Sequence, residues 1–255
     1  MHERLYQQCR VRDVLELDNP MTRRRRLLFG LGLIALGLAT VPLDGTVRDF
    51  LWTRRVGGDV KRELEFLQQF GAISSIVLIS LVILLLDPAD ARLKWRRIAD
   101  IAVAAVLSGL IGNFLKMFFG RPRPLFDDPM HLLGPLGKYP VESASGGVRL
   151  MSAWEMGARG VSDLWSMPSS HSMAGACLAF CLSTLYPKLR PLCVALAVIV
   201  CSARVLLNAH YVSDVLIGAA LGWMIAAFAM RRELGSRLVT LAAPNLRPEA
   251  RPAAE

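Results

Sequence analysis

Six apolar segments dominate this 255-residue chain and decide what it can fold into. Each is mostly apolar over a length close to the roughly 20 residues that a membrane-spanning helix needs. None shows the polar stripe of a soluble amphipathic helix. The segments are 27–43, 70–86, 98–119, 172–186, 191–208 and 211–230. The sequence therefore predicts an all-α, polytopic membrane bundle with six transmembrane helices.

The basic residues fall unevenly on the two sides of these segments. Ten Lys and Arg residues lie in the loops 44–69 and 120–171. Eighteen of the 30 lie in the stretches that would share the opposite side, namely 1–26, 87–97, 187–190 and 231–255. Because cytoplasmic loops carry the excess of Lys and Arg, we expect both termini in the cytoplasm. The loops 44–69 and 120–171 are then expected on the outer face, which is periplasmic in a bacterial inner membrane.

This topology divides the chain into a basic tail over 1–26, a membrane domain over 27–232 and a second tail over 233–255, which we expect to be disordered. One short interfacial helix is predicted in the first outer loop, where Val60, Leu64 and Leu67 recur at helical spacing. The arginine run at 23–26 also suits a signal peptide. However, 26 residues precede the first apolar segment and no clear cleavage site follows, so we expect a retained anchor.

Composition excludes several other classes of protein. A hydrophobic content of 53% excludes a disordered chain, and five cysteines in 255 residues exclude a small disulfide scaffold. A net charge of +9 would suggest nucleic-acid binding in a soluble protein. Here the membrane topology accounts for the charge, so the expected partner is the bilayer and no nucleic acid. Protein partners are left open.

Seven ionisable side chains lie in or beside the outer ends of the apolar segments. A charge at the bilayer centre costs roughly 2.5–3.5 kcal/mol, so such residues need an explanation. Separate snorkelling to the interface would explain one long cationic side chain, but not two of the chain's four histidines together with an aspartate. The topology brings to one membrane face Lys116, Arg121, Arg123, His171, Arg204, His210 and Asp214.

The spacing of His210 and Asp214 indicates a nucleophile. Four residues apart, they share one face of a helix, and the carboxylate can accept the Nδ1 proton of the imidazole. Nε2 is then left as a free nucleophilic nitrogen. Arg204 lies six residues earlier and offers a planar fork of donors that suits a phosphate.

Two further elements complete an expected phosphate site. Pro122 and Pro124 predict that the third apolar helix ends near Gly120, which lets Arg123 fold back over the site beside Lys116. The run 168–171, Pro-Ser-Ser-His, predicts a turn into a helix whose N-terminus binds an anion. Phosphoryl transfer requires mostly positioning and charge neutralisation, which three cations could supply. Asp127 and Asp128 lack partners at ligand spacing, so no metal and no cofactor are expected.

These residues resemble the type 2 phosphatidic acid phosphatase superfamily, which also includes the vanadium haloperoxidases. Its three signature motifs occur in order between residues 116 and 214, about 40% of the chain. K-x6-R-P is met by Lys116, Arg123 and Pro124; P-S-G-H by the run 168–171; and S-R-x5-H-x3-D by Arg204, His210 and Asp214. Two positions depart from the motifs: Ser170 replaces the usual Gly, and Ala203 replaces the usual Ser.

The resemblance implies an all-α fold, metal-free hydrolysis and a role for each residue. His210 would be the nucleophile that forms a phosphohistidine, Asp214 its orienting partner, and His171 the general acid. The phosphate cradle would consist of Lys116, Arg123, Ser169, Ser170 and Arg204. The departure at Ser170 puts substrate choice in question more than catalysis.

We therefore expect a membrane phosphatase for a lipid phosphomonoester or pyrophosphate, of the phosphatidic acid, phosphatidylglycerophosphate, polyprenyl pyrophosphate or lipid A class. A lipid phosphotransferase of the same fold would carry the same motifs. A non-catalytic protein that binds or transports lipid phosphates is a third alternative, although binding alone needs neither a nucleophile nor an acid.

Overall fold

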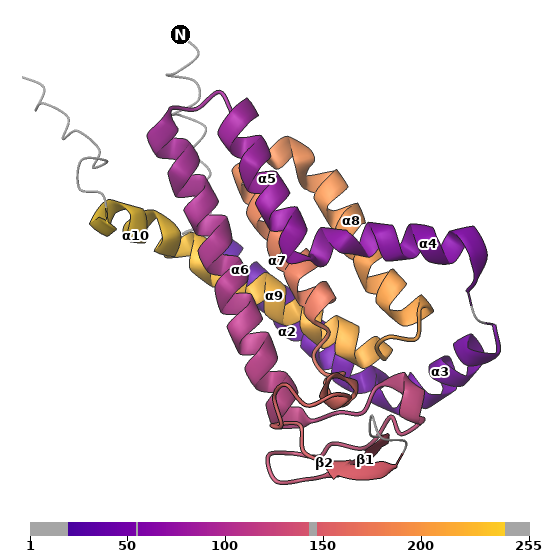
Figure 1. Ribbon diagram of the computed structural model, residues 1–255. Helices are drawn as coiled ribbons and strands as arrows, with labels where there is room; N and C mark the ends of the chain where they lie inside the picture. The colour runs from indigo at the N-terminus through magenta and orange to yellow at the C-terminus, as the bar shows by residue number, and fades with distance from the viewer. Residues whose placement is uncertain (1–19, 55, 143–146, 243–255) are drawn as a thin grey trace, which may run out of the picture.

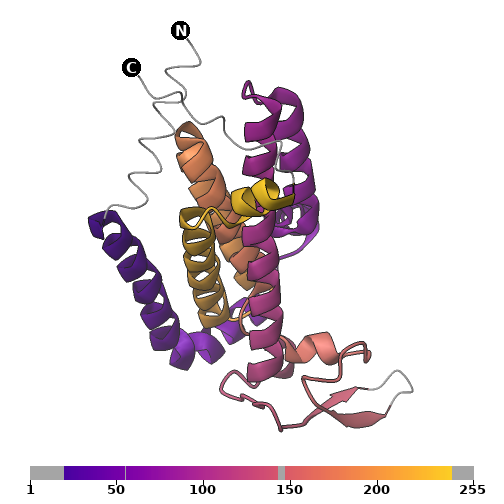
Figure 2. The ribbon, with the colours of Figure 1, turned by 90° about the vertical axis from the view of Figure 1, so that its left-hand side faces the viewer.

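The computed structural model describes residues 20–54, 56–142 and 147–242. Most of them are helical, and one small antiparallel hairpin projects from the end of the bundle at which α6 stops (Figures 1 and 2). The hairpin consists of β1 (Tyr139–Glu142) and β2 (Val148–Met151). The helices are α2 (Pro20–Thr40), α3 (Asp44–Thr53), α4 (Gly58–Leu67), α5 (Ile73–Leu86), α6 (Ala91–Phe119), α7 (Ser170–Leu185), α8 (Arg190–Leu206), α9 (Val212–Arg231) and α10 (Leu234–Ala242).

Each of the six apolar segments is a helix in the structure, but the segments differ in length. Four stretches within the described residues are long and apolar enough to cross a membrane, namely those containing α2, α6, α8 and α9. A fifth crossing is reached if Gly58–Gly71 and Ile73–Leu86, which meet at a bend of 62°, count as one span. The apolar helix α7 has 16 residues, which is short for a span. The chain is a multi-pass membrane protein, and the count of six crossings stays a prediction.

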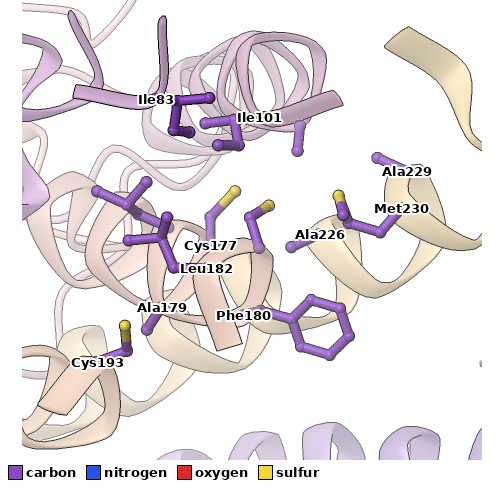
Figure 3. Close-up of a cluster of buried hydrophobic side chains, with 13 residues drawn as sticks. Ile83, Ile101, Cys177, Ala179, Phe180, Leu182, Cys193, Ala226, Ala229 and Met230 are labelled. Atoms are coloured by element: carbon purple, nitrogen blue, oxygen red, sulfur yellow. The ribbon is translucent and has the colours of Figure 1, made fainter. Parts of the chain in front are cut away.

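Helix α7 lies at the centre of the bundle and packs against α6, α8 and α9. Its buried side chains form much of the main apolar core, together with residues of α6 and α9 (Figure 3). Glycines on α9 let its backbone approach α7 closely. A Cβ at Gly222 would lie 1.9 Å from the carbonyl oxygen of Met173, and a Cβ at Gly218 would lie 2.7 Å from that of Ser169. Small residues at such contacts are how membrane helices gain van der Waals packing.

The third apolar helix ends where the sequence predicts. Asp90 caps its start by accepting a hydrogen bond of 2.7 Å from the backbone nitrogen of Leu93. Its last helical residue is Phe119, and Gly120 follows in the left-handed region with φ of 57°. Glycine adopts this conformation without a Cβ clash, and the prolines beyond it cannot continue the helix. The chain then turns away and brings residues 121–123 back across the end of the bundle.

The loops 44–69 and 120–171 contain more regular structure than the sequence suggested. The short helix expected in 44–69 is confirmed as α4, but the loop also contains α3, which was not foreseen. The loop 120–171 carries the hairpin and has a small apolar core of its own. That core is formed by Leu133, Val141, Met151, Ala153, Val161 and Leu164.

Both predicted tails need correction where the structure describes them. The tail over 233–255 was expected to be disordered, but α10 occupies Leu234–Ala242. Asp100 of α6 holds this helix by accepting hydrogen bonds from the backbone nitrogen of Ser236 at 2.8 Å and from its hydroxyl at 2.7 Å. In the N-terminal tail, residues 20–26 already belong to α2. Residues 1–19 and 243–255 lie outside the described part of the chain.

Candidate active site

His210 is presented by the turn that joins α8 to α9. After Leu206 the chain passes through Asn208, whose φ is 51°. The backbone nitrogens of Ala209 and His210 then both donate to the carbonyl oxygen of Arg204, each at 3.1 Å. This folded helix end uses carbonyl groups that would otherwise lack partners. It also places His210 against the last turn of α8, next to Arg204, which belongs to the same sequence motif.

The imidazole of His210 is oriented by a main-chain group. Its Nδ1 lies 2.7 Å from the carbonyl oxygen of Ser166, which can only accept a hydrogen bond. Nδ1 must therefore carry the proton, and Nε2 has the free lone pair. The expected partner Asp214 lies farther away, with 3.8 Å between Nδ1 and Oδ2. The nucleophilic tautomer foreseen from the sequence is thus present, but the hydrogen bond that fixes it goes to Ser166.

Asp214 is fully buried in the first turn of α9 and is held by several donors. Its Oδ1 accepts a hydrogen bond of 2.6 Å from Nη1 of Arg121. Its Oδ2 accepts one from the hydroxyl of Ser166 and one of 3.0 Å from the backbone nitrogen of Tyr211. The carboxylate therefore stays ionised and fixed in place beside His210.

Arg121 belongs to this cluster through a second carboxylate. Its Nη2 donates to Oδ2 of Asp44 at 2.8 Å, and Nη1 also donates to the hydroxyl of Ser213 at 2.7 Å. The backbone nitrogen of Ser213 donates to Oδ1 of Asp44 at 3.1 Å. The side chains of Arg121, Asp44 and Asp214 are each at most 1% exposed. A buried ionic chain thus joins the start of α3, the segment after α6 and the start of α9.

The three expected phosphate-binding cations are positioned by other parts of the chain. Nζ of Lys116 donates to the carbonyl oxygen of Trp165 at 3.0 Å. Nη1 of Arg204 donates to Oε1 of Gln68 at 2.6 Å. Lys116 and Arg204 are 6% and 8% exposed.

Two of these cations keep unused donors. The backbone nitrogen of Arg123 donates to the carbonyl oxygen of Asp163 at 2.8 Å. This contact positions the residue and does not involve its guanidinium. Within the described residues, the buried Nε atoms of Arg123 and Arg204 have no hydrogen-bond partner. Buried donors rarely remain unsatisfied, so these atoms point to an anionic ligand that would complete them.

The turn at 168–171 leads into α7 as the sequence predicts. Ser169 precedes the helix and is buried; its backbone nitrogen donates to the carbonyl oxygen of Asp214 at 3.1 Å. The hydroxyl of Ser172 donates to that of Ser169 at 3.0 Å. Ser170 and His171 are the first residues of α7, and both side chains are half-buried. The helix N-terminus and the histidine therefore remain reachable by a ligand.

Electrostatic interactions connect the residues that the sequence motifs place far apart. Burial lowers the pKa of His171 to about 4, and the charges of Arg204, Lys116 and Arg123 act in the same direction. Burial lowers the pKa of His210 to about 3; the charges of Lys116 and Arg204 act in the same direction, whereas Asp214 opposes them. His210 is therefore neutral at physiological pH, which is the form that can act as a nucleophile. The structure places all eight predicted site residues at one end of the bundle.

Asp127 and Asp128 in the loop 120–171 have other partners. Asp127 forms an ion pair of 2.9 Å with Arg48, and Asp128 lies 3.5 Å from Nδ1 of His131. Among the residues that the structure describes, no three His, Cys, Asp or Glu side chains form a group that could hold a metal ion.

Sequence reasoning missed several residues of this site. Arg121 was noticed as one of the charges at the membrane face but received no role. Asp44 directly follows an apolar segment, and an ionisable residue at that position was the signal that could have identified it. Gln68 and Ser166 carried no such signal. Neither did Gly71, where a Cβ would lie 2.3 Å from the carbonyl oxygen of His171.

Two known proteins are similar to this chain in sequence. The chain is 29% identical over 175 residues to a lipid A 1-phosphatase of Rhizobium etli, covering 64% of this chain and 67% of that protein. It is 33% identical over 117 residues to a lipid A 1-phosphatase of Rhizobium johnstonii, covering 46% and 40% of the two chains.

The fold is similar to that of a transmembrane PAP2-type phosphatidylglycerolphosphate phosphatase from Bacillus subtilis. The TM-score is 0.52 at 21% identity, over 84% of this chain and 96% of that one. The family model of the PAP2 superfamily matches residues 97–236, which is more than half of the sequence and includes all three motifs. The chain therefore belongs to the PAP2 superfamily.

Proposed function

We propose that this protein is a metal-independent membrane phosphatase that hydrolyses a lipid phosphomonoester or pyrophosphate through a phosphohistidine. The observation that carries the proposal is the state of His210. Its Nδ1 proton is held by the carbonyl oxygen of Ser166 at 2.7 Å, so Nε2 is free to attack, and the unsatisfied Nε donors of Arg123 and Arg204 lie at the same end of the bundle. A dianionic phosphoryl group would satisfy these donors.

The reaction has two steps. In the first, Nε2 of His210 attacks phosphorus in line, an N–P bond forms and the P–O bond to the lipid breaks. The negative charge of the bound phosphate raises the lowered pKa of His171, so that this residue takes up a proton from solvent and gives it to the departing oxygen. In the second, His171 takes a proton from water, whose oxygen attacks phosphorus, and the N–P bond breaks. Inorganic phosphate leaves, and both histidines return to their starting states. Lys116, Arg123, Arg204 and the N-terminus of α7 would stabilise the charge on the equatorial oxygens.

A lipid substrate is favoured by where the site lies. The candidate residues gather at one end of a bundle of membrane helices, so a lipid headgroup could reach them while its tails stay in the bilayer. The two Rhizobium relatives are named lipid A 1-phosphatases, and this puts lipid A first in a panel that also contains phosphatidic acid, phosphatidylglycerophosphate and polyprenyl pyrophosphate.

The test is phosphate release from these four lipid classes by purified protein in detergent. We expect turnover of at least one class in excess EDTA, inhibition by vanadate, and trapping of an acid-labile, base-stable phosphoenzyme in a rapid quench. Loss of activity in EDTA that added metal restores would contradict the metal-free proposal. Passage of labelled phosphate to a second lipid instead of water would make the protein a phosphotransferase. Lipid binding without turnover would make it a binding protein.

We also propose an orientation in the membrane. The excess of Lys and Arg supports cytoplasmic termini and a site on the periplasmic face. Reporter fusions test this directly. Fluorescence of a cytoplasm-dependent reporter joined to residue 255, together with labelling of a cysteine at position 136 by an impermeant reagent in intact cells, would support it. The reverse pattern would overturn it.

A further inference from the structure

We propose that Asp44 is a positioning residue for the reaction, acting on His210 through Arg121 and Asp214. The inference rests on the proposed function, because it assigns a role within the same site. Asp44 lies at the first position of α3 and does not belong to any of the three motifs. In the structure two hydrogen bonds, both made by Arg121, connect its carboxylate to that of Asp214, which lies beside His210.

The contacts form a continuous chain. Oδ2 of Asp44 accepts from Nη2 of Arg121 at 2.8 Å, and Nη1 of the same guanidinium donates to Oδ1 of Asp214 at 2.6 Å. Asp214 lies 3.8 Å from Nδ1 of His210. One guanidinium is thus shared between two carboxylates that are 170 positions apart in the chain. Its fork geometry allows this bridge, which a lysine ammonium could not reproduce.

Burial gives this arrangement its electrostatic effect. The side chain of Asp44 is 0% exposed, and those of Arg121 and Asp214 are 1% and 0% exposed. Charges in such surroundings are screened much less by water and salt than charges at the surface. Counting Arg121 as +1 and the two carboxylates as −1 each, the cluster carries a net charge of −1.

That net negative charge has a use in the reaction. When Nε2 of His210 attacks phosphorus while Nδ1 keeps its proton, the imidazole becomes a cation. A neighbouring negative charge stabilises the transition state that leads to it. If Asp44 were neutral, the whole positive charge of Arg121 would be directed at Asp214, and the cluster would no longer favour the cation. Asp44 therefore sets how much of the charge of Asp214 is available to His210.

The alternative is that Asp44 serves only to tie the corner between α2 and α3 to α9. Its Oδ1 accepts from the backbone nitrogen of Ser213 at 3.1 Å, and its Oδ2 also accepts from the hydroxyl of Ser213. A residue with only this role would change stability, but would not specifically change the step in which the imidazole gains charge. The two roles can therefore be separated by measuring that step.

The experiment compares Asp44→Asn with two matched variants. Asp49→Asn removes a carboxylate from the same helix, but one that is exposed and paired with Arg48 at 2.8 Å. Ser213→Ala removes hydroxyl contacts to Asp44 and Arg121 without changing any charge. For each variant, the melting temperature in detergent is measured alongside kcat, KM and the single-turnover rate of phosphoenzyme formation.

We expect Asp44→Asn to slow phosphoenzyme formation by at least about tenfold, with KM changed less than about twofold because the phosphate-binding cations are untouched. Asp49→Asn should match the wild type. Ser213→Ala should lower the melting temperature but slow phosphoenzyme formation less than about threefold. Asp44→Glu, which keeps the charge, should recover part of the rate. The Asp44→Glu variant also keeps the proposal testable if Asn at this position prevents folding.

A double-mutant cycle tests whether the effect passes through Arg121. In an Arg121→Gln background, the further change Asp44→Asn should cost less than about twofold, because the positive charge that Asp44 offsets is already gone. Full additivity, or an Asp44→Asn rate within twofold of the wild type, would overturn the proposal. These outcomes differ from failure of the proposed function, in which the wild-type protein itself would form no phosphoenzyme.

Discussion

Nδ1 of His210 lies 2.7 Å from the carbonyl oxygen of Ser166, although 44 positions separate the two residues in the chain. Because a carbonyl oxygen only accepts hydrogen bonds, this contact determines which imidazole nitrogen is protonated. Ser166 also donates its hydroxyl to Asp214. One residue of the loop 120–171 therefore fixes both the tautomer of His210 and the carboxylate beside it.

Replacing His210 should abolish the covalent step. We expect His210→Ala to lower kcat by at least about a thousandfold and to leave no phosphoenzyme in a rapid quench, because the nitrogen that attacks phosphorus is removed. His131→Ala is the matched control, since that histidine is in the loop 120–171 with 45% of its side chain exposed. Phosphoenzyme formed at a normal rate by the His210 variant would contradict the assignment.

The pH dependence of phosphoenzyme formation should lack an acid limb near the ordinary pKa of histidine. Burial lowers the pKa of His210 to about 3, so the imidazole stays neutral and nucleophilic down to about pH 4. Single-turnover rates at saturating substrate between pH 4.5 and 8 measure this. A loss of rate below pH 6.5 in the wild type, if seen equally with substrates of different phosphate pKa, would show that His210 becomes protonated there.

The same shift predicts how pH affects stability. The unfolded chain binds a proton at His210 near pH 6.5, whereas the folded protein does not until about pH 3. The unfolded state therefore gains protons first as the pH falls, and stability is lost between these two values. His210→Gln removes this contribution, so its melting temperature in detergent should fall less from pH 7 to pH 5 than that of the wild type. An equal fall would contradict the lowered pKa.

Gln68 should affect substrate binding through Arg204. Its Oε1 accepts a hydrogen bond of 2.6 Å from Nη1 of Arg204, and this fixes one end of the guanidinium. We expect Gln68→Ala to raise KM and the inhibition constant of vanadate by about three- to tenfold, with a smaller effect on kcat. The neighbouring Gln69 is exposed, and its side chain donates to the carbonyl oxygen of Glu65, so Gln69→Ala provides the control. Equal effects of the two changes would show that Gln68 does not position Arg204.

A methyl group at Gly218 should disturb the helix N-terminus at the site. A Cβ there would lie 2.7 Å from the carbonyl oxygen of Ser169 and 3.1 Å from its nitrogen, so one of the two backbones must move. We expect Gly218→Ala to destabilise the protein by about 1–3 kcal/mol and to lower kcat/KM. Gly109→Ala on α6 meets open space and should leave both unchanged. Thermal unfolding in detergent and steady-state kinetics measure the two effects.

The helices of this protein could be predicted from local features of the sequence. A long apolar run forms a helix in a membrane because its backbone groups have no other partners, and Gly120 with the prolines after it ends α6. The tails and the loop 44–69 were predicted less well. Helices α3 and α10 are short, and α10 is held by Asp100, which lies 136 positions before Ser236, so a local pattern could not reveal it.

The sequence by itself determined which residues to examine at the site, because charged residues at the ends of apolar segments must have a reason to be there. Only the tertiary structure decided how they are connected. Arg121 and Asp214 are 93 positions apart, and Asp44 is a further 77 from Arg121, so nothing local couples them. The partner of His210 is a main-chain carbonyl, a group that every residue possesses. Sequence patterns record side chains, and so this contact becomes visible only when the chain is folded.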